Sequence, residues 1–121
     1  MKITDVTVTL FGWDDLPSRK YAKHTGKTAG GHSELGLVTI KTDEGAAGHA
    51  FLGSSSQGAH FDAASLITYL KPLLLGRNPL DREHLYQQMW PRNRRTTLRC
   101  IGAVDVALWD LGGKIAGLPI H

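Results

Sequence analysis

At 121 residues the chain suits one domain and is too short for an eight-stranded α/β barrel, which needs about 250 residues. Apolar residues at 41% and charged residues at 21% exclude a disordered chain, and the net charge of +3 decides little about partners. The apolar runs are far shorter than a membrane span of about 20 residues, the N-terminus lacks a secretory pattern, and one cysteine cannot form an internal disulfide. We therefore expect a cytoplasmic protein with no membrane partner.

Three strands are predicted in the first half of the chain. Residues 3–11 alternate apolar and polar side chains with many β-branched residues, which is typical of a half-buried strand. Residues 35–42 and 46–52 flank Asp43-Glu44-Gly45 and predict an antiparallel hairpin with a glycine-containing turn. The sequence from Gly12 to about Ser33 has no period and predicts a long loop, which is uncommon in a compact domain unless it is functional.

Helices are predicted in the second half, after a second loop at residues 53–58. An apolar helical face begins near Phe61, and Pro72 predicts that this helix ends or bends near Leu70 or Lys71. A short second helix is expected with Asn78-Pro79 as cap and first position and Pro91 as its stop; its apolar side would carry Leu85, Met89 and Trp90.

The third and longest helix is expected over Leu98 to Ala116, with Gly117 and Pro119 as its stop. Asp110 and Lys114 are spaced as an exposed ion pair, and the apolar stripe comprises Ile101, Val104, Leu108, Leu111 and Ile115. Three antiparallel strands followed by about three helices predict one α+β domain over residues 1–121.

Two stretches of the chain carry a resemblance to known proteins. Residues 102–120, GAVDVALWDLGGKIAGLPI, resemble the helix that joins the N-terminal cap to the barrel in the mandelate racemase and muconate lactonizing family of the enolase superfamily. Residues 42–52, TDEGAAGHAFL, resemble the second hairpin of the same cap, and the Gly-His pair is similar to that of mandelate racemase. The resemblance covers the whole chain.

The resemblance implies an enolase-like N-terminal capping domain, 1–121, that ends at the junction to a C-terminal α/β barrel absent from this chain. In such enzymes the barrel holds Mg²⁺ and the acid/base groups, and a proton is removed next to a carboxylate. We therefore expect no catalytic residue and no metal ligand in this chain. The full-length enzyme would be a lyase or isomerase, an acid-sugar dehydratase or a racemase/epimerase, whose partners are its own barrel, a small anionic carboxylate substrate and further copies of itself.

The same resemblance indicates which residues choose the substrate. Residues 21–25 align with a Tyr-x-x-His-Thr segment of mandelate racemase, and Lys23 and Lys27 fall where that enzyme has valines against a phenyl ring. Ammonium groups suit a carboxylate or hydroxyl-rich ligand better than an aromatic ring, so we expect an acid sugar rather than mandelate. His24, Ser54 and Ser55 complete the substrate-binding candidates, although His24 could instead hold its own loop and the serines could form only a flexible turn.

Other residues have a structural interpretation. Cys100 lies in a predicted helix and is expected to pack there, and His49 is expected to be a hydrogen-bonded interior or interface residue. Asp105 and Asp110 are five residues apart and therefore point in different directions from a helix, as caps, salt bridges or struts facing the barrel.

Two other classes remain open. Arg92-Asn93-Arg94-Arg95 with Arg99 could form an anion or nucleic-acid patch, but the charge is modest and base-stacking aromatic pairs are missing, so no nucleic-acid partner is expected. A freestanding interaction module with a cap-like fold is the second alternative.

Overall fold

The computed structural model describes residues 1–17, 31–53 and 58–121, and these residues form a sheet covered on one face by helices. The strands are β1 (Ile3–Leu16), β2 (Gly31–Thr42) and β3 (Ala47–Leu52), in the order β1-β2-β3 with both neighbouring pairs antiparallel. The predicted hairpin turn is confirmed, because Gly45 has a φ of 86° and the Thr42 N–H donates to the Ala46 carbonyl. The α+β architecture predicted from the sequence is therefore correct.

Alternation along the strands places one apolar set under the helices. Val6 pairs with Ile40, and Val38 pairs with both Val8 on β1 and Ala50 on β3. Side chains of directly paired residues lie on the same face of a sheet, so these residues form a continuous apolar layer. The layer is the floor of the core, with Val6, Val38 and Ile40 fully buried.

The predicted loop from Gly12 to Ser33 is wrong at both of its ends. β1 continues to Leu16 and β2 begins at Gly31, with Gly12 paired to Glu34 and Trp13 paired to Ser33. Backbone pairing does not itself require alternating apolar and polar side chains, and the large side chain of Trp13 is exposed and not part of the core. The alternation of apolar and polar residues that predicts a strand was therefore missing from residues that nevertheless form one.

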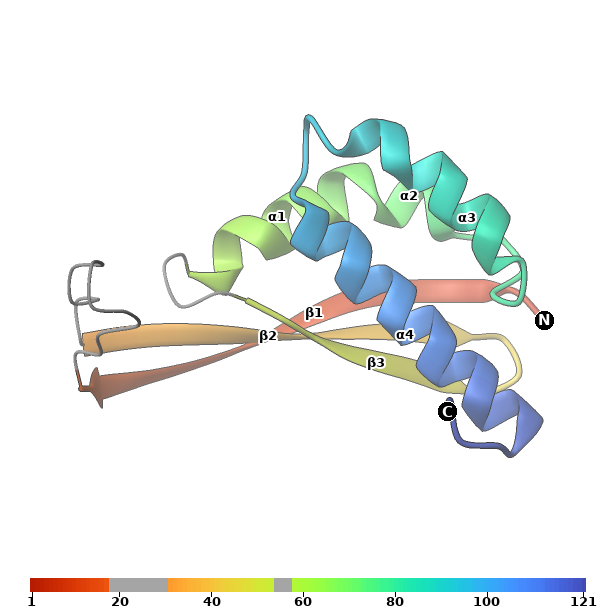
Figure 1. The fold of residues 1–121 in the computed structure, drawn as a ribbon, viewed down its shortest axis with the longest axis horizontal. Helices are drawn as coiled ribbons and strands as arrows, with labels where there is room; N and C mark the ends of the chain where they lie inside the picture. The colour runs from red at the N-terminus through yellow and green to blue at the C-terminus, as the bar shows by residue number, and fades with distance from the viewer. Residues whose placement is uncertain (18–30, 54–57) are drawn as a thin grey trace.

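The helices form a second layer on one face of the sheet (Figure 1). They are α1 (Ala59–Tyr69), α2 (Lys71–Leu74), α3 (Arg82–Met89) and α4 (Leu98–Ala116), with a short 3₁₀ helix η1 (Trp90–Arg92) after α3. The break predicted near Leu70 is confirmed, since Pro72 lies in the first turn of α2. A second helix, α2, begins directly after the break, so the structure has two helices where the sequence predicted one.

The predicted start of the next helix is wrong by about a turn. α3 begins at Arg82 with Asp81 as its N-cap position, because the Asn78 side chain accepts a hydrogen bond from the Leu80 N–H at 3.0 Å. An Asn side chain bonded to the backbone two residues ahead favours a turn over a helix. The predicted apolar side is correct for Leu85 and Met89 and wrong for Trp90, whose side chain is 46% exposed.

Helix α4 has the predicted bounds and lies against β3 (Figure 1). Thr97 caps its start by accepting from the Cys100 N–H, Gly117 ends it with a φ of 65°, and Cys100 is buried as expected. Gly48 on β3 allows the close approach, because a Cβ there would lie 2.7 Å from the Leu111 Cβ. Contact between helix and strand therefore requires glycine at position 48.

Side chains of α4 also complete the open edge of β3. The Asp110 carboxylate accepts from the His49 N–H at 2.8 Å, and Lys114 Nζ donates to the Ala47 carbonyl at 3.1 Å and lies 2.6 Å from Asp110. Burial acts to raise the pKa of Asp110, but the bonds from Lys114 and the His49 backbone outweigh it and hold that pKa below its usual range. The Asp110–Lys114 pair is confirmed, and the exposed His49 ring lies hydrogen-bonded beside it.

Candidate functional site

The two segments that carry the predicted substrate-binding residues start and end at one end of the sheet. β1 ends and β2 begins there, and the chain runs from the end of β3 into α1 at the same end (Figure 1). Gly53, just after β3, lies against β2, since a Cβ on it would be 3.4 Å from the Glu34 carbonyl oxygen. The residues that border the second segment, Gly53 and Gly58, therefore lie beside Glu34, near the start of β2.

The five predicted substrate-binding residues, Lys23, His24, Lys27, Ser54 and Ser55, lie outside the described residues. Their roles stay predictions. What the structure adds is the arrangement of the residues that border them, which sequence reasoning did not identify.

Glu34 on β2 and His60 on α1 form the first of these bordering contacts. The His60 Nδ1 and a Glu34 carboxylate oxygen are a close hydrogen-bonded pair, and the Glu34 side chain is largely covered while His60 is half-exposed. The hydrogen bond with His60 holds the pKa of Glu34 below its usual range, against a smaller opposing effect of burial. Any side chain at Gly58 would overlap both groups, so the contact also constrains the entry to α1.

A second pair lies at the far end of the β1–β2 hairpin. The His32 Nδ1 is 2.9 Å from the Asp14 carboxylate, and both side chains are exposed. An exposed pair of this kind contributes little to stability, about 0–1 kcal/mol. Its significance is positional, because it joins the two strands between which residues 18–30 are inserted.

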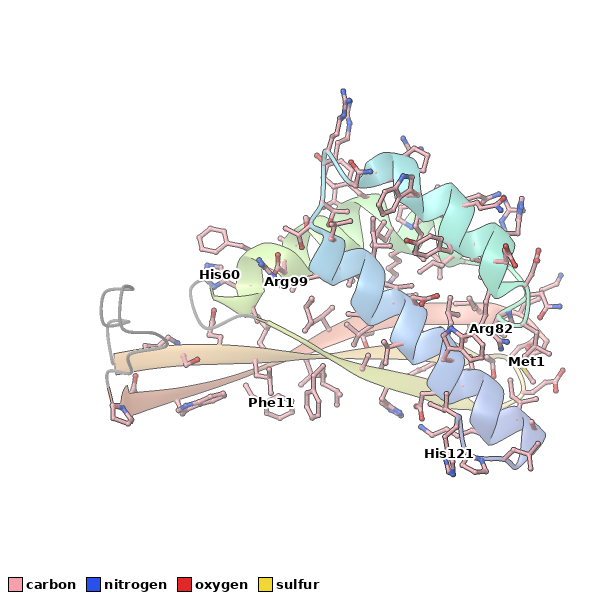
Figure 2. The ribbon with its side chains drawn as sticks, in the orientation of Figure 1. Met1, Phe11, His60, Arg82, Arg99 and His121 are labelled. Atoms are coloured by element: carbon pink, nitrogen blue, oxygen red, sulfur yellow. The ribbon has the colours of Figure 1, made fainter. Side chains whose placement is uncertain are left out.

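A buried carboxylate fixes the start of α1 against the start of α4. Asp62 is 1% exposed and accepts from Arg99 Nε and from Thr97 Oγ1, each at 3.0 Å. Figure 2 shows Arg99 beside the end of α1 that carries His60. Arg99 is thereby engaged in an ion pair inside the domain, which removes it from the arginine-rich surface patch considered from the sequence.

A metal site does not emerge from the part of the chain that the structure describes. No group of three or more His, Cys, Asp or Glu side chains in residues 1–17, 31–53 and 58–121 could hold an ion. Asp105 and Asp110 do not converge, as expected: Asp110 is bonded to β3, whereas Asp105 faces a groove between α3 and α4. Among the described helices, none is long and apolar enough to cross a membrane.

The sequence matches the model of a known family over most of its length. Residues 6–121 match the model of the mandelate racemase / muconate lactonizing enzyme, N-terminal domain. A D-mannonate dehydratase from Sphingomonas sp. (strain SKA58) is 41% identical over 93 residues, which are 70% of this chain and 22% of that enzyme. The chain thus spans about a fifth of the length of this relative.

Solved structures agree with the family match. A racemase from Streptomyces coelicolor A3(2) with bound magnesium is 31% identical, with a TM-score of 0.76 over 94% of this chain and 32% of that one. D-glucarate dehydratase from Agrobacterium tumefaciens, complexed with magnesium, is 28% identical, with a TM-score of 0.72 over 99% of this chain and 31% of that one.

Proposed function

The chain belongs to the mandelate racemase/muconate lactonizing enzyme family through its N-terminal domain, and we propose that it is the substrate-selecting cap of an acid-sugar dehydratase. The mannonate and glucarate dehydratases among its relatives support this substrate class. Racemisation or epimerisation of a related hydroxy acid is the neighbouring possibility within the same chemistry. The reaction would start with removal of a proton next to the substrate carboxylate.

The observation that carries the proposal is the contact between Glu34 and His60. It joins β2, the strand that follows residues 18–30, to α1, the helix that follows residues 54–57. Binding residues placed on loops above a rigid scaffold are a common arrangement in enzymes. Lys23 and Lys27 would there pair with a carboxylate or hydroxyls of the sugar, with His24, Ser54 and Ser55 as further hydrogen-bonding groups.

In the proposed enzyme, magnesium would be bound by residues outside this chain. Both solved relatives described above contain magnesium, whereas the described part of this chain lacks a ligand set. The ion would be held, and its Lewis acidity supplied, by the C-terminal barrel. The part of the present chain would be to orient the substrate and to cover it from water.

A domain chimera tests the proposal. Residues 1–121 would replace the N-terminal domain of the Sphingomonas D-mannonate dehydratase, and kcat/KM would be measured with D-mannonate, D-galactonate, D-glucarate and mandelate. We expect turnover of at least one acid sugar and none of mandelate. Lys23→Ala or Lys27→Ala should lower kcat/KM by about tenfold, the loss of one charged contact, whereas Lys2→Ala, an exposed lysine on β1's N-terminal side, should leave it unchanged.

The contrary results are equally defined. Equal kcat/KM in the lysine variants would refute the assignment of Lys23 and Lys27. A folded chimera without turnover of any acid sugar, together with an isolated chain that stays a stable monomer, would favour a freestanding interaction module. Light scattering of the chimera also tests the expected homo-oligomer.

A further inference from the structure

The outer side of α3 and η1 carries a pair of exposed aromatic rings. Leu85 and Met89 are buried on the inner side of α3, whereas Tyr86 and Trp90 on the outer side are 39% and 46% exposed. The two rings stack on each other, with their centres 6.0 Å apart. α3 packs on α2 and α4 and lies on the side of the helical layer away from the sheet (Figure 1). Grouped exposed aromatic side chains of this kind mark an interaction surface.

Charges of opposite sign flank the aromatic pair. Asp81 and Glu83 are exposed at the start of α3 and form an acidic end, whereas Arg92, Arg94 and Arg95 are exposed at and just beyond the end of η1 and form a basic end. The ion pairs found among the described residues include none of these five side chains. The surface is therefore acidic at one end, aromatic in the middle and basic at the other end.

Arg82, which stands between the two acids of the acidic end in the sequence, is turned toward α4. Its guanidinium lies 3.9 Å from the centre of the Trp109 ring, and Figure 2 shows Arg82 beside α4. A Cβ on Gly112 would lie 2.6 Å from Nη1, so glycine at this position admits the guanidinium. The positive charge next to both acids in the sequence is thereby held against α4, where it also acts on the Asp105 carboxyl.

The order of these groups is self-complementary under a two-fold rotation. Gln88 lies midway between Tyr86 and Trp90 in the sequence. In an antiparallel pair of α3 helices centred at Gln88, Tyr86 of each copy therefore lies beside Trp90 of the other copy. The two acids precede Gln88 by seven and five residues, and the three arginines follow it by four to seven. Each acidic end is therefore level with the basic end of the other copy, as an isologous interface requires.

A groove beside α3 gives room for the aromatic contact. Leu80, Glu83 and Tyr86, together with residues of α4, line a groove of about 530 Å³. A Trp90 ring that a two-fold rotation brings beside Tyr86 therefore lies at the border of this groove. An aromatic side chain set in a hollow of the partner, with charged groups around it, is the usual centre of a protein interface.

We propose that the outer side of α3 and η1 pairs antiparallel with the same surface of a second copy of this chain, with aromatic pair on aromatic pair and each acidic end on a basic end. The order of the charges selects this occupant, because a uniformly acidic or basic partner would be repelled by one of the two ends. The contact of two such short helices buries less than the about 1,600 Å² of a standard interface, so we expect a weak dimer with a Kd of about 10–100 µM. The proposal concerns assembly and does not depend on the substrate of the enzyme.

Sedimentation velocity of charge-reversed variants tests the surface. The Kd for dimerisation would be measured for the 121-residue chain, for Glu83→Arg at the acidic end and for Arg94→Glu at the basic end. Glu44→Arg and Arg77→Glu are the matched controls, because they make the same charge changes at exposed residues of turns outside the surface. We expect the Kd to rise at least about tenfold in each surface variant, since one reversal places like charges opposite each other twice in a symmetric dimer, and by less than about threefold in the controls.

Mixing the two surface variants distinguishes charge pairing from a general loss of affinity. In a heterodimer of Glu83→Arg with Arg94→Glu, the new arginine faces the new glutamate and the second contact is the original one. The affinity of the mixture should therefore return to within about threefold of that of the unaltered chain. Trp90→Ala should raise the Kd about tenfold, whereas Phe51→Ala, at a more exposed aromatic side chain on the outer face of the sheet, should not.

The contrary outcomes each overturn the proposal. A chain that stays monomeric at concentrations well above the expected Kd has no such dimer. Self-association that both charge variants leave unchanged, or that Phe51→Ala weakens in place of Trp90→Ala, assigns the contact to another surface. Weakening by both charge variants without recovery in their mixture shows that the two ends do not face each other. None of these measurements involves turnover, so the result is independent of the proposed function.

Discussion

Replacing Gly48 by alanine is the sharpest test of how α4 is placed on the sheet. The new Cβ would overlap the Ala107 carbonyl oxygen and would lie 2.7 Å from the Leu111 Cβ and 3.0 Å from the Leu111 nitrogen. Two of these three atoms belong to the helix backbone, so a side-chain rotation cannot relieve the overlap. α4 would have to move away from β3, and the bonds of Asp110 to His49 and of Lys114 to Ala47 would lengthen with it.

The expected cost lies at the upper end of the range for overpacking, about 3 kcal/mol. A domain of this size has roughly 6–18 kcal/mol of stability, and each kcal/mol corresponds to about 3–5 °C in Tm. Gly48→Ala should therefore lower the Tm of the chain by about 10–15 °C, measured by circular dichroism or calorimetry. The loss should appear in the urea midpoint as well.

Gly102→Ala is the matched control, because it makes the same chemical change where there is room. Gly102 lies within α4, and nothing lies within 4 Å of a Cβ built on it. Alanine is favoured over glycine in a helix by about 1 kcal/mol, so this variant should raise the Tm by a few degrees. If Gly48→Ala were as stable as the parent chain, α4 would not be packed on β3 as described and the reasoning would be refuted.

Three further predictions concern charged groups. Asp62→Ala removes the buried carboxylate that accepts from both Arg99 and Thr97 and should cost about 3 kcal/mol in urea unfolding. A loss below about 1 kcal/mol would contradict the structural role of Asp62. Burial raises the pKa of Asp105, so its ionised form destabilises the fold at neutral pH. Asp105→Asn should therefore raise the Tm of the isolated chain at pH 7, and the gain should vanish in acid, where the carboxyl is protonated in both the folded and the unfolded chain. A lower Tm of the variant at pH 7 would refute this reasoning. The pKa of Glu34 is depressed below its ordinary value of 4.5, so the contact with His60 stabilises the fold above that pH and is lost as the pH falls through the depressed value. Glu34→Gln should therefore flatten the acid side of the curve of Tm against pH. An unchanged slope would show that the pair does not contribute to stability.

The fold was predictable where local signals agreed with tertiary packing. α4 combines a 3.6-residue apolar period with Thr97 before it and Gly117 after it, and its observed bounds are those predicted. The start of α3 was mispredicted because two local rules competed at Asn78, and the side-chain bond to Leu80 prevailed over the helix-start pattern. The loop boundaries were mispredicted because the paired residues there contribute no alternating apolar set to the core, and backbone pairing alone leaves no pattern in the sequence.

The contacts around the candidate site were predictable only in part. Asp14 and His32 follow from the β1–β2 register once Trp13 is paired with Ser33, so a longer predicted strand would have found them. Glu34 and His60 are brought together by the packing of α1 on β2, and Asp62 meets Arg99 through the crossing of α1 and α4. No spacing in the sequence encodes those two approaches, because each depends on how separate elements are placed in space.

The position of these contacts is consistent with the proposed function, in which the segments at residues 18–30 and 54–57 would choose the substrate. Glu34–His60 and Asp62–Arg99 both tie rigid elements together beside the borders of residues 54–57, and Asp14–His32 does so beside residues 18–30. None of the three pairs includes a residue from those segments. Under the proposed function, replacing Lys23 or Lys27 by valine in the chimera is expected to change kcat/KM with little change in Tm. A large drop in Tm from Lys23→Val or Lys27→Val would show instead that these lysines hold the scaffold and not the substrate.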